Sequence, residues 1–208
     1  MNISKFLLID AALAIAAIPL LFLLQGGKKG SALLRSSNKE ELLRKTSVKL
    51  PDKERLIELE KLSKNHGSQI KLDLLMGNWK FISVWEKDID KENPVFSSLL
   101  RIFSAKIEFK KEISTENSNK FYVVASIQFG LFTIEFSGSG CLKGKQPLLE
   151  FFLNLIELKS GSNTLLSRYV KKGEEKEKSY FALIAIEENG KWLSARGQSG
   201  AVVIWLKD

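Results

Sequence analysis

Hydrophobic positions divide the chain into three regions, and the first of them is almost wholly apolar. Residues 6–24 read FLLIDAALAIAAIPLLFLL and contain a single charged residue, Asp10. Because a helix of about 20 apolar residues spans the hydrocarbon core of a bilayer, this pattern predicts a membrane anchor within residues 1–27. Lys28 and Lys29 stand where a signal peptide would be cleaved, and no small-residue cleavage pattern follows the apolar run, so an uncleaved anchor is favoured.

The second region, residues 28–71, changes to helical spacing and is strongly basic. Leu56, Leu59 and Leu62 recur every three residues and predict an amphipathic helix that ends before Gly67. The region carries 12 basic and 6 acidic residues. Two interpretations of this charge stay open: contact with anionic lipid headgroups, or a solvated linker. By the positive-inside rule, the flanking charges place the C-terminal domain on the cytoplasmic or stromal side of the membrane.

The third region, residues 72–208, alternates between apolar and polar residues with the period of two that is typical of β-strands. Asn189-Gly190, a strong signal for a type I′ turn, joins two of the alternating segments. The segments expected to form strands are 79–86, 102–113, 120–129, 131–138, 148–159, 164–172, 179–188, 191–197 and 201–206. Eight or nine short strands joined by turns predict an antiparallel up-and-down β-barrel, which can enclose side chains or one small ligand.

Charge and reactive side chains argue against several classes of function. Most of the net charge of +8 lies before the barrel, whereas a nucleic-acid-binding protein would more often carry a basic patch on its folded domain. Cys141 and His66 are the only cysteine and histidine, so the chain can form neither an internal disulfide nor a thiol-based metal site. They also offer no catalytic pair. We therefore expect no metal, no nucleic-acid partner and no enzymatic activity.

The sequence Gly77-Asn78-Trp79 at the head of the first strand resembles the opening of lipocalins. In that family the Trp closes one end of the barrel, and an Arg near the final strand commonly packs over it. The resemblance implies that Arg196 packs over Trp79, with a cation–π contact as the physical gain.

Two longer segments resemble the plastid lipid-associated protein family, also called fibrillins, which has cyanobacterial members. LDLLMGNWKFISVW, residues 72–85, is similar to its opening motif L-L-x-G-x-W-x-L-x-Y, and the helix KERLIELEKL precedes it. WLSARGQSGAVVIWLKD, residues 192–208, is similar to its closing motif R-x-x-R-G-x-x-G-x-x-F-V-L, with Leu193 in place of the first Arg. The resemblance implies a lipocalin-like barrel that binds lipids, isoprenoids or carotenoids at the thylakoid membrane.

Two functions remain as hypotheses. The first is a membrane-anchored binding protein for a lipid, quinone or carotenoid-type ligand at a photosynthetic (thylakoid) membrane, with membrane lipids as partners and no other cofactor. The second is an interaction or assembly factor for a photosynthetic membrane complex, with a solidly packed barrel. An enzyme acting on an apolar substrate is the weakest alternative. The residues expected to contact a ligand are Trp79, Trp85, Phe129, Phe132, Ile134, Phe136 and Arg196, each of which could instead simply fill or close the barrel.

Overall fold

The computed structural model describes residues 39, 43, 46–87, 91–112, 119–145, 147–170 and 179–208. The predicted membrane anchor, residues 1–27, lies outside this part of the chain. None of the helices that the structure describes is both long enough and apolar enough to cross a bilayer.

The described residues form three helices and nine strands. The helices are α4 (Lys53–His66), α5 (Leu72–Leu75) and α6 (Pro94–Ile102). The strands are β1 (Gly77–Trp85), β2 (Lys106–Lys111), β3 (Lys120–Phe129), β4 (Phe132–Lys143), β5 (Leu148–Ser160), β6 (Asn163–Tyr169), β7 (Ser179–Ile186), β8 (Trp192–Gly197) and β9 (Val202–Lys207). All strand pairs are antiparallel, which confirms the mainly β fold class predicted from the alternating pattern.

Helix α6 and the turn after it take the place of the start of a predicted strand. The alternating pattern of residues 102–113 predicted one continuous strand, but β2 begins only at Lys106. The preceding chain is helical because Asn93 caps the helix, accepting a hydrogen bond from the backbone N–H of Phe96 at 3.0 Å. Pro94 occupies the first turn, where its missing N–H costs nothing.

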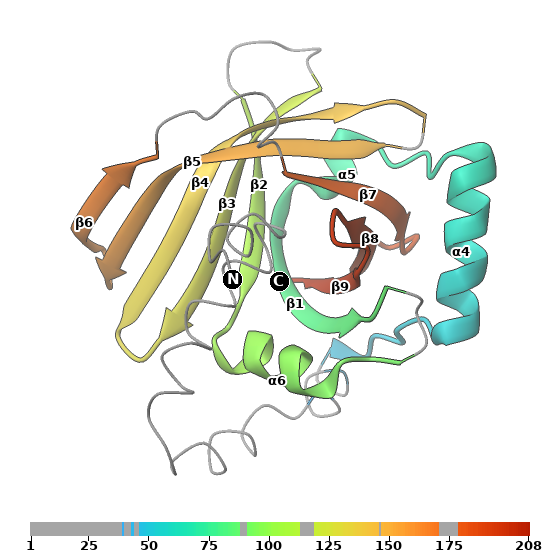
Figure 1. The fold of residues 1–208 in the computed structure, drawn as a ribbon, viewed down its shortest axis with the longest axis horizontal. Helices are drawn as coiled ribbons and strands as arrows, with labels where there is room; N and C mark the ends of the chain where they lie inside the picture. Colours follow the sequence, from blue (N-terminus) through green and yellow to red (C-terminus); the bar gives the residue numbers. More distant parts are fainter. Residues whose placement is uncertain are drawn as a thin grey trace, which may run out of the picture.

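The nine strands form one sheet that closes on itself unevenly (Figure 1). The neighbours around the ring are β1, β2, β3, β4, β5, β7, β8 and β9, and β9 pairs back with β1. The irregularity lies in β5, which pairs with β7 through residues 148–151 and with β6 through residues 155–160. The predicted barrel is therefore closed over only part of its length, and the sheet continues beyond the closed part.

We call the part of the sheet beyond the closed barrel the sheet extension. It comprises residues 124–129 of β3, 132–137 of β4, 155–160 of β5 and the whole of β6. Figure 1 shows the sheet extension reaching away from β7, β8 and β9, with β6 at its outer margin.

Aromatic side chains fill the interior of the closed barrel. The ring of Trp205 contacts those of Phe81 and Phe181, with centroid separations of 5.2 and 5.3 Å. Phe109 and Phe121 form an edge-to-face pair at 5.5 Å. None of these five residues is more than 6% exposed. Because such rings bury large apolar areas in close contact, they form a packed core rather than an open lumen.

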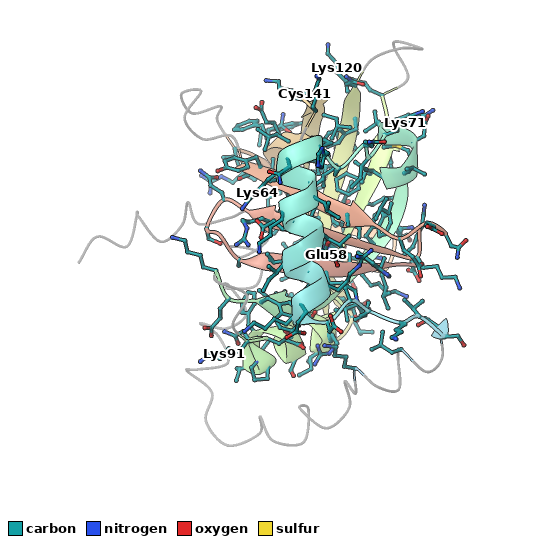
Figure 2. All side chains as sticks on the ribbon, turned by 90° about the vertical axis from the view of Figure 1, so that its right-hand side faces the viewer. Glu58, Lys64, Lys71, Lys91, Lys120 and Cys141 are labelled. Atoms are coloured by element: carbon teal, nitrogen blue, oxygen red, sulfur yellow. The ribbon has the colours of Figure 1, made fainter. Side chains whose placement is uncertain are left out.

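Helix α4 lies outside the ring and crosses the C-terminal strands (Figure 2). Its Leu56 is fully buried and packs in one cluster with Ile184 of β7 and Ile204 of β9. The hydroxyl of Ser63 donates a hydrogen bond of 3.0 Å to the carbonyl oxygen of Leu183. This carbonyl belongs to the part of β7 that no longer pairs with β5, so α4 covers a sheet edge that would otherwise be open.

A glycine in β4 allows the two strands of its hairpin to approach closely. Gly138 lies where the register of β4 and β5 shifts, and a Cβ atom there would lie 1.9 Å from the carbonyl oxygen of Phe152. We expect Gly138→Ala to lower the free energy of unfolding by about 1–3 kcal/mol, because one strand must move. Urea unfolding followed by tryptophan fluorescence measures the loss, and Ser139→Ala at the exposed neighbour is the control. Equal stability of the two variants would contradict the expectation.

Candidate binding site

Trp79 closes the end of the barrel at which β1 begins. Gly77 has a φ of +113°, a conformation that side chains rarely allow, and this lets the chain turn from α5 into β1. Trp79 is fully buried, and its indole Nε1 donates a hydrogen bond of 2.7 Å to the carbonyl oxygen of Leu75. The ammonium of Lys207 lies 5.1 Å from the ring centroid. The Gly-x-Trp sequence therefore builds a structural closure with a cation over its ring.

The predicted contact between Arg196 and Trp79 is wrong. In the sheet, Trp79 pairs with Lys207 and Arg196 pairs with Val202, so the two side chains belong to opposite ends of β9. The cation over Trp79 is the lysine that faces it across β1 and β9. Arg196 instead forms a bidentate ion pair with Glu60 of α4, in which Nε lies 2.6 Å from Oε1 and Nη2 lies 2.5 Å from Oε2.

Arg196 fastens α4 and two loops to the barrel. Its Nη1 also donates to the backbone carbonyl oxygens of Lys87 and Gly200, and the ammonium of Lys64 lies 3.0 Å from Glu60. Burial raises the pKa of Glu60, but hydrogen bonds from Arg196 and Lys64 outweigh it and hold that pKa below its ordinary value. The geometry is that of a structural clamp, and ligand contact by Arg196 stays an untested prediction.

Trp85 lies at the opposite end of β1 from Trp79 and on the outer side of the ring. It packs against the cluster beneath α4 that contains Leu56 and Val202. Its Nε1 is buried and has no hydrogen-bond partner within the described part of the chain. The barrel wall therefore separates Trp85 from the residues that line the interior.

The four remaining predicted residues lie together on one face of the sheet extension. Phe129 and Phe132 face each other across β3 and β4, with ring centroids 5.9 Å apart. They are 37% and 41% exposed. Ile134 and Phe136 follow on the same face, half-buried against the edge of the barrel core. Alternate residues of a strand share one face, and this face lies beside the closed barrel and not inside it.

Residues of β5 and β6 extend the same face. Leu158 lies between Ile134 and Leu166 in the register of the three strands, and Ile156 lies beside Phe136. Alternation could not identify the β5 residues, because LLEFFLNLIELK is apolar at most positions. We call this surface the apolar face, and its members are Phe129, Phe132, Ile134, Phe136, Ile156, Leu158 and Leu166.

The opposite face of the sheet extension is charged. The ammonium of Lys159 lies 2.6 Å from the carboxylate of Glu135 on the neighbouring strand β4. It also lies 3.2 Å from the carboxylate of Glu157 on its own strand, β5. Its hydrogen bond to Glu135 is the main cause that raises the pKa of Lys159. Antiparallel sheets normally bury one face and expose a polar one. Here the polar face is in place, but part of the apolar face is left exposed.

A second feature lies at the other end of β3 and β4. A shallow hollow of about 430 Å³ is lined by Lys120, Cys141 and Lys143, together with Glu150 and neighbouring residues. Lys143 and Glu150 form an ion pair of 2.7 Å across it, and Figure 2 shows Lys120 and Cys141 at the same end of the molecule. Among the described residues, no group of His, Cys, Asp and Glu side chains is arranged to hold a metal ion. We place the candidate site on the apolar face because its large apolar side chains are exposed and contiguous.

Comparisons of this chain with protein-family models, with curated proteins and with solved structures give no match. The resemblance to the plastid lipid-associated protein family stays a prediction from the residues quoted above.

Proposed function

We propose that this protein is a membrane-tethered, non-enzymatic binding protein that holds a lipid, quinone or carotenoid-type molecule against the apolar face. The observation that carries the proposal is the exposure of contiguous aromatic and aliphatic side chains on this face. Phe132 is 41% exposed and Leu166 is 62% exposed, within one patch of a folded sheet. Extended apolar patches on a protein surface mark places where a partner, a ligand or a membrane binds.

The proposed position of the ligand differs from a lipocalin-like lumen. Trp205 and four phenylalanine rings pack together inside the closed barrel, so we place the ligand on the sheet extension beside it. Covering a half-exposed Phe or Leu side chain gains about 1–2 kcal/mol from the apolar area removed from water. The combined gain from several such side chains, among them Phe129, Phe132 and Leu166, is enough to hold a long, flexible apolar molecule.

The membrane setting rests on the sequence. Residues 6–24 supply the proposed anchor, and the basic residues that follow place the sheet on the cytoplasmic or stromal side. The resemblance to plastid lipid-associated proteins suggests that the membrane is photosynthetic. Membrane lipids are then both the surroundings of the domain and one candidate class of ligand.

Mutation of the apolar face tests the proposal. The full-length protein would be purified from its own membranes in mild detergent, and bound molecules identified by native mass spectrometry and solvent extraction. We expect a stoichiometric apolar molecule in the wild type and a dissociation constant about tenfold higher in Phe132→Lys, since one lost contact of this size is worth about 1.4 kcal/mol. The variant should therefore carry clearly less than one molecule per chain. Tyr122→Lys is the matched control, because Tyr122 is an exposed aromatic residue whose side chain lies on the other face of β3.

Either of two results would contradict the proposal. One is a wild-type protein that carries no apolar molecule from its native membrane. The other is a bound molecule that Phe132→Lys and Tyr122→Lys reduce equally, since that molecule would not lie on the apolar face.

A specific observation supports the second hypothesis, an assembly factor for a membrane complex. The aromatic packing around Trp205 gives the closed barrel the solid interior that a scaffold requires. In that case a defined membrane protein complex should copurify with the wild type in place of an apolar molecule. Crosslinking from the polar face of the sheet or from α4 would then capture the same complex each time.

A further inference from the structure

Strand β6 is a sheet edge that is regular and unprotected from Leu166 to Tyr169, beyond a register shift that leaves Leu165 without a partner on β5. Among the described residues it pairs with β5 alone, and all seven of its side chains are exposed. Its sequence NTLLSRY contains no proline and one charge, Arg168. Natural proteins usually protect such an edge with prolines, several charges or a covering element, as α4 does for β7 here. An edge without this protection is a template for another strand.

We propose that β6 pairs antiparallel with β6 of a second copy of this chain, so that two sheet extensions join into one continuous sheet. The proposal concerns backbone pairing, so it does not depend on a ligand being bound to the apolar face.

The register of β5 and β6 shows which backbone groups are available. The N–H of Val170 donates to the carbonyl oxygen of Asn154 at 2.8 Å. Because antiparallel partners alternate between hydrogen-bonded and non-hydrogen-bonded pairs, Arg168 also faces β5, paired with Ile156. Ser167 lies between Leu166 and Arg168, both of which face β5, so its own N–H and C=O groups point away from β5, toward the free edge.

A two-fold axis at Ser167 satisfies this edge. Ser167 then exchanges backbone hydrogen bonds with the partner's Ser167, and both copies use the same donors and acceptors.

Charge favours this register over the next one for two copies of the chain. An axis one residue further along would place Arg168 directly opposite the partner's Arg168, which destabilises the pair. The axis at Ser167 instead places Arg168 opposite the partner's Leu166. The row Ile134–Leu158–Leu166 also runs to the edge, where Leu166 meets the aliphatic stem of the partner's Arg168 on the same face. The axis makes this contact twice, once in each copy.

Disulfide trapping tests the register directly. In the full-length protein carrying Cys141→Ser, we would introduce Ser167→Cys and compare it with Ser139→Cys, an exposed serine on the central strand β4. At the two-fold axis the Cα atoms lie about 5.5 Å apart, within the range that a disulfide bridges. We expect at least about tenfold more disulfide-linked dimer from Ser167→Cys than from Ser139→Cys under mild oxidation.

A second variant tests the pairing without a new thiol. Ser167→Pro removes an N–H that points to the free edge, so the bonds between β5 and β6 are kept and the domain should melt as the wild type does. Sedimentation of the full-length protein in detergent should show a dimer whose dissociation constant rises at least about tenfold in Ser167→Pro.

Three outcomes would overturn the proposal. The first is equal disulfide yields from Ser167→Cys and Ser139→Cys, which indicates random collision. The second is a wild type that stays monomeric at every concentration, or a dimer that Ser167→Pro leaves unchanged. The third is trapping of Ser167→Cys to a different protein only, which would make the edge a site for a foreign strand.

Discussion

Replacing Trp79 with alanine should cost about 3–5 kcal/mol of unfolding free energy, one of the two largest losses we expect from one substitution in this domain. The side chain is fully buried, so the variant leaves a large cavity at the closed end of the barrel. It also leaves the carbonyl oxygen of Leu75 without its donor. Chemical unfolding followed by far-UV circular dichroism measures the effect without relying on the tryptophan signal.

The two tryptophans of β1 provide a matched comparison for the hydrogen bond alone. Trp79→Phe removes a donor that is used, whereas Trp85→Phe removes a buried N–H that has no partner among the described residues. Trp79→Phe should therefore lower the free energy of unfolding by about 1 kcal/mol more than Trp85→Phe does. A Trp85→Phe variant that is less stable than Trp79→Phe would contradict the closure that we assign to Trp79.

Replacing Arg196 with methionine should destabilise the domain by about 3–5 kcal/mol at neutral pH, because it leaves the mostly buried carboxylate of Glu60 without its main partner. Lys64 remains 3.0 Å from that carboxylate and sets the lower end of this range. The double variant Glu60→Gln with Arg196→Met should recover part of the loss, because it no longer buries a charge.

The effect of Arg196→Met should also depend on pH. The pKa of Glu60 in the folded protein lies below its ordinary value of 4.5. The ion pair therefore stabilises the fold fully above about pH 4.5 and loses this contribution as the pH falls through the lower, folded-state pKa. Urea unfolding of the wild type and the variant at pH 7 and across the acid range should show two stabilities that converge below pH 4.5. A constant difference across this range would exclude the clamp as its cause.

Local sequence patterns identified most of the elements correctly. The apolar spacing before Gly67 predicted helix α4, whose N-cap residue Asp52 accepts a hydrogen bond from the backbone N–H of Arg55. Alternation along β3 and β4 agrees with the face that Phe129, Phe132, Ile134 and Phe136 share. These features depend on neighbours within a few residues, and that is the range over which period and capping signals act.

The features that the sequence did not predict depend on pairing between distant segments. Arg196 follows a motif that resembles a barrel closure, yet its partner is Glu60, a helix residue far away in sequence. The division of β5 between β7 and β6 also has no local signal, because each half of the strand is equally apolar. The position of the candidate site beside the barrel follows from that division. The sequence could therefore indicate which residues contribute to the site, but not where in the fold the site lies.

The pairing of β1 with β9 has a consequence for the order of events during synthesis. β1 ends at Trp85 and is made long before β9, which begins at Val202 and is the last strand of the ring. Until β9 emerges from the ribosome, β1 lacks one of its neighbours and the aromatic interior stays open to water. Contacts between such distant segments form slowly, and the folding intermediates that lack them expose apolar surface and are prone to aggregate. Nascent chains of this protein should therefore depend on chaperones for most of their time on the ribosome.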